Sequence, residues 1–544
     1  MVRLAMRASA ALGLSLAIAA ALVEAPPAAA TDGRAELPRV FLDTHYVKPA
    51  GDTIRVRAGD DLQHALGVAQ PGDQVVLQAG ATFTGNFVLP DKSGDATIVV
   101  RTSGLRDLPP QGERAGPADA AAMARIETPN TFGAITTANG AHDWRFVGIE
   151  FGIAPGTPAN TGVVRLGQGD ERRLAALPTD MVIDRSWVHG NPTGNARRGV
   201  SLNGIREAVV DSYVSDFHEV GADAQAIAGW NGPGPFKIVD DFLEGSGENV
   251  MFGGADPAIR KLVPSDIEIR RNHFFKPLSW RVGDPSYAGT HWTVKNIFEL
   301  KNARRVLVRG NVLENCWGDA QTGFGVNLKS ADQDGTAPWS QTSDVTFRDN
   351  IVRHAASAVT VVGRDPGTER LTRRVTIQNN VFEDIDGRRW GGSGIFLQVV
   401  SGPAPVGGGS AAGPAYLVVD HNTAFQTGST IVADGAPSQG FAFTNDIAAH
   451  NRYGVKGTGT ATGTPTLEQF FPGYRFERNV IVGGKAALYP LHNFFPATWD
   501  EVGFVDLAGG DYRLAPDSPY AGRGQGGTDP GADVDALEAA LGGP

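Results

Sequence analysis

The amino-acid sequence predicts an all-β protein built as a parallel β-solenoid, and three observations support this prediction. Glycine accounts for 70 of the 544 residues, and this abundance disfavours long helices because glycine costs about 1 kcal/mol at a helical position. A short motif recurs through the middle of the chain with a mean spacing of 33 residues. Most copies alternate apolar and polar residues with the period of two that is typical of β-strands.

The first thirty residues have the pattern of a secretory signal peptide. Arg3 and Arg7 precede an apolar run over residues 8–23, and three alanines ending at Ala30 supply the small residues of a cleavage site. We therefore predict cleavage near Ala30 and a secreted or periplasmic protein. Residues 31–51 then form an N-terminal extension.

Composition disfavours several classes of partner. The net charge of −11 opposes non-specific binding to nucleic acid or to an anionic membrane, since both attract basic surfaces. No second apolar stretch of about 20 residues follows the signal sequence, so we expect no membrane span. Cys316 is the only cysteine, which leaves no internal disulfide and suits a small buried hydrophobic residue. We expect a soluble monomer.

The repeated motif consists of two apolar residues separated by one residue, then two polar residues, then asparagine. Clear copies end at Asn272, Asn311, Asn350, Asn380, Asn422 and Asn479, and weaker copies place Ile149, Ser186, Ser212, Asp241 and Asp446 at the same position. One such coil cannot bury its apolar face, but stacked coils can. Stacking also aligns the asparagines, so we expect their side chains to hydrogen-bond to one another at the turn of every coil.

The two ends of the solenoid need covering, because open ends expose apolar side chains and unpaired strand edges. Residues 60–63 resemble a capping box, and an apolar stripe follows, so we predict an N-terminal capping helix over residues 61–69. The period breaks down in a region rich in glycine and threonine, 454–464. We place the solenoid at residues 52–482 and a tail packed on its end at 483–544.

The helix, turn and strand of the opening, residues 60–77, together with the asparagine-bearing coils, resemble secreted right-handed parallel β-helix proteins. This pectate-lyase-like superfamily includes enzymes similar to chondroitinase B and alginate lyase. The resemblance covers roughly residues 52–482 and implies a right-handed parallel β-helix with an extracellular polysaccharide as partner. Members of the group include lyases, glycoside hydrolases, epimerases and phage tail adhesins, so the function must be inferred from a site.

Two neighbouring coils place polar residues on the outer face of the solenoid. Because their apolar neighbours point inward, the outward residues are Glu299, Lys301, Asn327 and Lys329. If the coils are in register, Glu299 lies beside Asn327 and Lys301 beside Lys329. Two stacked lysines repel, and this would lower the pKa of each. We expect Asn249, on a nearby coil, to join Asn327 in binding substrate.

A lysine of lowered pKa suits β-elimination from a polymer that contains uronic acids. A base removes the proton α to the carboxylate, and positive charge stabilises the enolate-like intermediate. We predict that Lys301 or Lys329 is the base, while the other lysine, with Arg281 or a metal ion, faces the substrate carboxylate. The resemblance implies a lysine, an arginine and a Ca²⁺ ion held by acidic side chains, of which Glu299 and Lys301 match a part.

Two long insertions beside this face are rich in aromatic residues, which suit stacking on the apolar faces of sugar rings. The candidates for substrate binding in these insertions are Trp280, Tyr287, His291, Trp292, Trp317, Asp319 and Trp339. The alternative is that the tryptophans pack the loops onto the solenoid.

Two other functions remain open beside the lyase. Glu248, Glu299 and Asp319 could provide the acid and base of a glycoside hydrolase. A rod that binds a polysaccharide without cleaving it would show the same repeat and the same loops. Unsaturated products would identify a lyase, new reducing ends without them a hydrolase, and retention on a polysaccharide gel with neither a binding protein.

Overall fold

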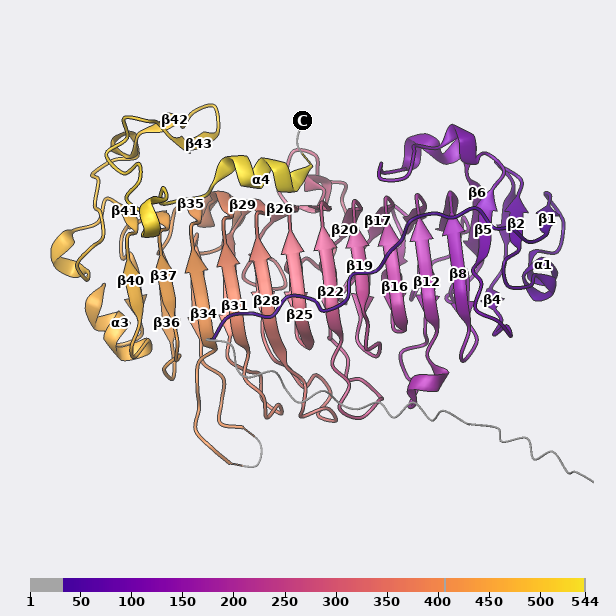
Figure 1. The fold of residues 1–544 in the computed structure, drawn as a ribbon, viewed down its shortest axis with the longest axis horizontal. Coiled ribbons are helices and arrows are strands. Elements are labelled where there is room, and N and C mark those ends of the chain that lie inside the picture. The colour runs from indigo at the N-terminus through magenta and orange to yellow at the C-terminus, as the bar shows by residue number, and fades with distance from the viewer. Residues whose placement is uncertain (1–32, 406–407, 543–544) are drawn as a thin grey trace, which may run out of the picture. The chain divides into compact units, whose positions relative to one another are not determined.

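The computed structural model describes residues 33–405 and 408–542, and the predicted signal peptide lies outside them. From Arg34 onward the chain forms one compact unit. Three parallel sheets of 14, 13 and 12 strands run along this unit and are here called sheets A, B and C (Figure 1). In the middle of the unit each coil contributes one strand to A, then B, then C, so the chain is a right-handed parallel β-helix.

Sheet A contains β1 (Thr53–Val56), β2 (Gln74–Leu77), β5 (Ile98–Thr102), β8 (His142–Val147), β12 (Thr179–Asp184), β16 (Ile205–Val210), β19 (Phe236–Val239), β22 (Ser265–Arg270), β25 (Ala303–Arg309), β28 (Thr342–Arg348), β31 (Arg373–Gln378), β34 (Ala415–Asp420), β37 (Ala442–Thr444) and β40 (Arg475–Glu477). Sheet B contains β3 (Thr82–Thr84), β6 (Ala124–Thr128), β9 (Ile149–Ile153), β13 (Trp187–His189), β17 (Tyr213–Phe217), β20 (Phe242–Gly245), β23 (His273–Phe275), β26 (Val312–Cys316), β29 (Ile351–Ala355), β32 (Val381–Ile385), β35 (Thr423–Gln426), β38 (Ile447–Ala449) and β41 (Val480–Val482).

Sheet C contains β4 (Phe87–Leu89), β7 (Ile135–Thr137), β11 (Val164–Leu166), β15 (Arg198–Leu202), β18 (Gln225–Gly229), β21 (Glu248–Phe252), β24 (Phe298–Leu300), β27 (Phe324–Leu328), β30 (Ser357–Val362), β33 (Leu397–Val400), β36 (Ile431–Asp434) and β39 (Val455–Gly457). Two further pairs are β10 (Ala159–Asn160) with β14 (Asn195–Ala196), and β42 (Phe504–Asp506) with β43 (Asp511–Leu514). The α-helices of the described residues are α1 (Leu62–Val68), α2 (Gly387–Trp390), α3 (Thr464–Phe470) and α4 (Val534–Leu541).

The core lies between the three sheets and is filled by apolar side chains that stack coil over coil. In sheet C, for example, Val250, Phe298, Val326, Val359 and Leu397 are register partners on successive strands, and all are buried. This alternation fixes which residues of each strand face outward.

The predicted asparagine ladder is confirmed at the turn between sheets A and B. The backbone N–H of Asn272 donates to Oδ1 of Asn311 (2.9 Å), that of Asn311 to Asn350 (3.0 Å), and that of Asn350 to Asn380 (2.9 Å). The same bond links every aligned position from Ile149 to Asn479. It continues to Asn493, which the sequence analysis missed.

The residue before each ladder position adopts a left-handed backbone conformation. Arg271, Asp349 and His421 have φ values of 53°, 55° and 53°, a region that costs non-glycine residues of order 1 kcal/mol. Gly310 occupies this position in one coil, where an added Cβ would lie 2.2 Å from the carbonyl oxygen of Ala540. The C-terminal helix α4 therefore packs along the flank of the solenoid at this turn (Figure 1).

Helix α1 forms within the predicted range, although its cap differs from the prediction. Asp61, and not Asp60, is the N-cap, because its carboxylate accepts the N–H of His64 at 2.9 Å. Gln63 bonds to the backbone of Val88 and completes no capping box. Leu62 and other apolar residues of α1 join the main core. Among the described residues, no helix is long and apolar enough to cross a membrane.

The N-terminal extension crosses the outer face of sheet A (Figure 1). The N–H groups of Glu36 and Arg39 donate to the carboxylates of Asp344 and Asp266, which lie on β28 and β22. Lys237 on β19 donates to the carbonyl of Leu42 at 3.0 Å. Each contact joins the extension to a different coil, so the extension ties several coils together.

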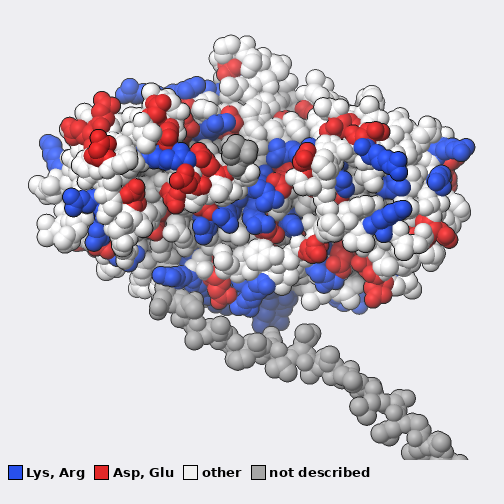
Figure 2. All heavy atoms as spheres, turned by 45° about the horizontal axis from the view of Figure 1, so that its top comes forward, with Lys and Arg blue, Asp and Glu red and all other residues white. Residues whose placement is uncertain are grey.

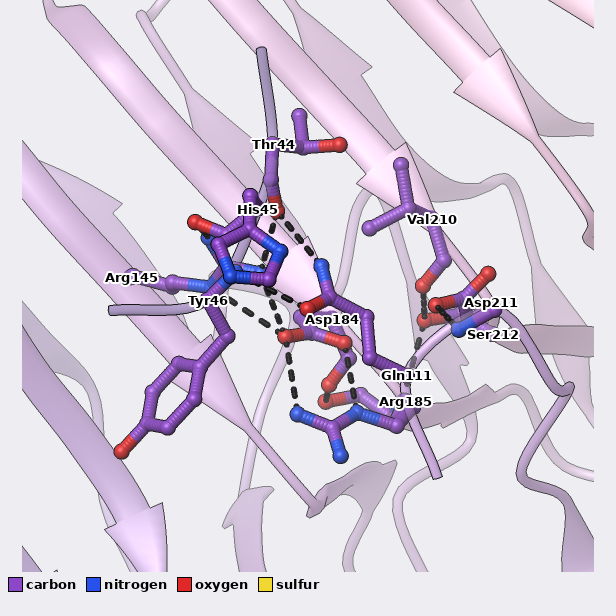
Figure 3. A network of polar contacts seen from close by, with 12 residues as sticks. Thr44, His45, Tyr46, Gln111, Arg145, Asp184, Arg185, Val210, Asp211 and Ser212 are labelled. Carbon is purple, nitrogen blue, oxygen red and sulfur yellow. Dashed lines mark hydrogen bonds and ion pairs between the residues drawn. The ribbon is translucent and has the colours of Figure 1, made fainter. Parts of the chain in front are cut away.

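A buried ion cluster anchors the far end of this extension (Figure 3). Asp184 is fully buried between Arg145 and Arg185, with N···O distances of 2.6 and 2.9 Å. Arg145 and Gln111 both donate to the carbonyl of Thr44, each at 2.8 Å. Because the buried charges are paired and hydrogen-bonded, we interpret this cluster as structural.

Charged residues of both signs are interspersed over the face of the molecule that Figure 2 shows. On sheet A, ion pairs join neighbouring strands, including Arg206–Asp180, Arg305–Asp266 and Arg374–Asp344 at 2.5 to 2.6 Å. The surface charges of sheet A are thus largely balanced locally.

Candidate functional site

The outer face of sheet C brings together polar side chains from consecutive strands. Glu299 on β24 and Asn327 on β27 are register partners, and Nδ2 of Asn327 donates to Oε1 of Glu299 at 2.9 Å. Lys301 and Lys329 follow these two strands at matching positions, since the N–H of Lys329 donates to the carbonyl of Leu300. Four of the predicted site residues are therefore neighbours.

The two lysines have separate partners. Nζ of Lys329 lies 2.7 Å from Oδ2 of Asp365 and 3.9 Å from Oε1 of Glu299. Nζ of Lys301 donates to Oε1 of Gln333 at 3.1 Å. The repulsion expected between stacked amines is therefore offset by nearby oxygen atoms. The side chain of Lys329 is 19% exposed, which leaves this amine open to solvent.

A second carboxyl group lies near Glu299. Glu248, the first residue of β21, is fully buried, as is Glu299. Burial raises the pKa of Glu248 to about 8, and the negative charge of Glu299 adds to this effect. Nε2 of Gln225 donates to Oε2 of Glu248 at 2.8 Å. Glu248 is therefore mostly protonated near neutral pH.

Four buried oxygen atoms of this cluster have no hydrogen-bond partner. They are Oε1 of Gln225, Oε1 of Glu248, Oε2 of Glu299 and Oδ1 of Asn327. Buried polar atoms are normally satisfied, and an unsatisfied one costs about 1–3 kcal/mol. Carboxylate and amide oxygens are ligands that Ca²⁺ prefers, but Gln225 and Asn327 lie three strand spacings apart, or about 14 Å, so these four oxygens do not meet at one ion and do not fit the calcium ion that the resemblance implies. In the described part of the chain, no three His, Cys, Asp or Glu side chains converge as a metal site.

A buried lysine that the sequence analysis missed holds Glu248 in position. Nζ of Lys276 donates to the carbonyls of Gly245, Ser246 and Gly247 at 2.6, 2.9 and 3.0 Å. These three residues form the turn that leads directly into β21. Burial lowers the pKa of Lys276 to about 8. Lys276 follows strand β23 in a segment without alternation, so no sequence pattern indicated this contact.

The tryptophans expected to bind sugar are mostly buried. Trp280 and Trp292 are only 5% and 3% exposed and pack with Trp317 and Trp390 in a small apolar cluster. His218 stacks on Trp292 with ring centroids 3.8 Å apart. This burial contradicts the prediction that Trp280 and Trp292 stack on sugar rings, because their rings serve to pack the loops onto the solenoid.

Asn249 and Arg281 also lie elsewhere than predicted. Asn249 lies in β21, and its Nδ2 donates to the carbonyls of Leu243 on β20 and Phe275 on β23, so the side chain is fully buried. Asn249 is therefore not on the outer face with Asn327, because its amide hydrogen-bonds to backbone carbonyls of sheet B. The guanidinium of Arg281 lies 4.7 Å from the ring centroid of Trp390. It contacts neither lysine.

The remaining candidates are on loops. Nε2 of His291 lies 2.6 Å from Oδ1 of Asp319, and His291 is exposed, with 62% of its side-chain surface accessible. The other carboxylate oxygen of Asp319 accepts the N–H of Val294. Trp339 is half-buried, and its Nε1 donates to the carbonyl of Leu262 at 3.0 Å. Among His291, Asp319 and Trp339, His291 has the most exposed side chain.

Comparison with known proteins gives only distant similarities. No family model and no curated protein matches the chain. A mannuronic acid specific polysaccharide family 6 lyase from human gut microbiota has 13% identity and a TM-score of 0.42, covering 82% of both chains. The PL6 family alginate lyase AlyGC has 12% identity and a TM-score of 0.47, covering 86% of this chain and 57% of that one. Pectate lyase Pel9A has 13% identity and a TM-score of 0.36, covering 88% and 96%.

Proposed function

We propose that this protein cleaves an extracellular polysaccharide that contains uronic acids, by β-elimination at the outer face of sheet C. The observation that supports the proposal is the buried pair Glu248 and Glu299, with Asn327 and Lys329 beside it and four oxygen atoms without partners. Buried polar atoms without hydrogen-bond partners destabilise the folded protein, so a ligand that supplies the missing partners is the simplest reason for their presence. The signal sequence predicted for residues 1–30 supports a polymer outside the cytoplasm as substrate.

In this proposal Lys329 removes the proton α to the substrate carboxylate. The freed electron pair forms the new C=C bond as the glycosidic C–O bond at the β carbon breaks, and the ammonium of Lys329 then returns the proton to the leaving oxygen. Lys329 is preferred over Lys301 because its side chain is partly exposed, whereas Lys301 is 7% exposed and bound to Gln333. Asp365, 2.7 Å away and with its side chain 33% exposed, accepts the proton of the Lys329 ammonium and so leaves the amine neutral. The amide of Asn327 hydrogen-bonds to the substrate carboxylate as negative charge develops on it.

Hydrolysis is less compatible with the geometry. Glycoside hydrolases hold their two carboxyl groups about 5 Å or about 6.5–9.5 Å apart, so that the sugar or a water fits between them. Glu248 and Glu299 are both fully buried, so neither can reach a sugar or a water in an open cleft. Asp319, the third carboxylate considered, pairs with His291 on a loop.

The proposal is tested by following ultraviolet absorbance of unsaturated products during incubation with a panel of uronic-acid polymers. We expect Lys329→Met to reduce turnover at least about 10³-fold, since the variant lacks the base. Lys456→Met is a matched control, because Lys456 lies on the outer face of sheet C, in the row of Asn327, on a distant coil. Full activity of Lys329→Met, or new reducing ends without unsaturated products, would contradict β-elimination by Lys329.

A further inference from the structure

We infer that Arg165 and Arg198 form an anion-binding subsite on the outer face of sheet C, which holds a second acidic group of the substrate. Its role in substrate binding rests on the proposed function, whereas its affinity for anions does not.

The two arginines lie on adjacent strands, and Arg198 is in line with Glu248. Arg165 is on β11, and Arg198 is the first residue of β15, which pairs with β11. Arg198 is the register partner of Gln225 on β18, and Gln225 is the register partner of Glu248 on β21. Arg198 and Glu248 are thus two strand spacings apart, or about 10 Å. A chain lying along the solenoid axis would contact both.

The protein balances the charge of this pair only in part: the negative charges of Glu248 and Asp223 act on Arg198, and Arg165 donates to Oγ1 of Thr161. Within residues 33–405 and 408–542, neither Arg165 nor Arg198 forms an ion pair, although the adjacent Arg197 pairs with Glu219 at 2.8 Å. Nε of Arg198 is buried without a hydrogen-bond partner. Burial and the charges of Arg197 and Arg165 lower the pKa of Arg198 to about 10. An arriving anion would therefore relieve repulsion and satisfy a buried donor.

The chemistry of the pair indicates what it binds. Guanidinium groups bind carboxylate or sulfate through paired, charge-assisted hydrogen bonds, and an uncharged sugar offers no such partner. The guanidinium of Arg198 lies 5.1 Å from the ring centroid of Trp230, which fixes its plane. The substrate class is therefore a glycan with acidic groups on more than one of its sugars, carboxylated or sulfated.

The test uses inorganic sulfate as the probe, titrated calorimetrically at low ionic strength. We expect saturable binding to the full chain and a loss of at least about tenfold in the double variant Arg165→Gln, Arg198→Gln. Arg206→Gln is the control, since Arg206 is a surface arginine already paired with Asp180 at 2.5 Å. We expect the Arg206→Gln variant to bind sulfate as tightly as the unmodified protein does. Unchanged binding in the double variant, or no binding to the unmodified protein, would overturn the inference.

Two further results separate this inference from the proposed function. If sulfate binding depends on the arginines and no uronic-acid polymer is cleaved, the anion-binding subsite is supported and the proposed lyase activity is contradicted. If a polymer is cleaved and sulfate binding is unchanged in the double variant, the lyase activity is supported and the subsite is contradicted. If the double variant does not fold, Arg165→Lys with Arg198→Lys retains the charge but removes the paired donors. We expect that variant to bind sulfate several-fold more weakly, and equal binding would count against the subsite.

Discussion

Two rows of polar side chains run along this solenoid, and they differ in how completely the protein satisfies them. In the ladder between sheets A and B, Asn350 accepts two hydrogen bonds from Asn311 and donates to the carbonyl of Val308 and to Asn380. On the outer face of sheet C, four buried oxygens have no partner, and two arginines have no counter-ion within the described residues. Among the described residues of the ladder, only the second carboxyl oxygens of Asp241 and Asp446 lack a partner. Since the same fold can satisfy one row almost completely, we interpret the row on sheet C as a ligand site.

The largest expected effect is on the satisfied row. Asn350→Ala removes both an acceptor and a donor and leaves the amide of Asn311 and the carbonyl of Val308 unpaired in the core. We expect the free energy of unfolding to fall by about 4 kcal/mol, because several buried groups lose their partners at once. Denaturant titration measures this fall, and a loss below about 1 kcal/mol would show that the ladder is dispensable.

On sheet C we expect a substitution to raise the free energy of unfolding. Because the pKa of Glu248 is raised in the folded protein, the folded state binds more protons than the unfolded state, and stability falls as pH rises from about 4 toward the folded pKa. Glu248→Gln removes this loss. We expect the variant to match the unmodified protein at pH 4 and to exceed it by about 2 kcal/mol at pH 8. Parallel stability curves for the two proteins would exclude the buried carboxyl pair.

A smaller gain in stability is expected from replacing an acidic residue of the ladder by asparagine. Asp446 is fully buried and takes the place of asparagine, and burial raises its pKa well above the usual range. Its Oδ1 accepts two hydrogen bonds from Asn422, while Oδ2 has no partner. Asp446→Asn should raise stability at pH 8 by about 1 kcal/mol and leave it unchanged near pH 4, since the two bonds from Asn422 already favour the carboxylate. A loss of stability at pH 8 would show that the carboxylate is needed.

The ladder could be predicted from the sequence because its signal is local. Each copy of the motif contains its own two strands and the turn between them. Even Ser186 and Asp446 could therefore be aligned with the asparagines by the apolar residues around them. Asn493 was missed because it follows the last regular coil, where the motif is absent. The alternation of β24 and β27 likewise placed Glu299 beside Asn327.

The rest of the site depends on contacts between residues distant in sequence. The position of Glu248 near Glu299 depends on the turn to which Lys276 donates its hydrogen bonds. The repeat in the sequence does not predict that turn. The burial of Trp292 depends on His218, some 70 residues earlier, which stacks on its ring. Aromatic composition alone could not distinguish a ring that packs a loop from one that faces a ligand.

The most direct test of the difference between the two rows is the free energy of unfolding of Glu299→Gln, measured beside that of Asn350→Ala at pH 7. Glutamine keeps the oxygen that accepts from Asn327 and removes a buried charge next to Glu248. We predict that Glu299→Gln is at least as stable as the unmodified protein. A loss as large as that of the ladder variant would contradict the account, because it would show that the fold depends on Glu299 as it depends on the asparagines.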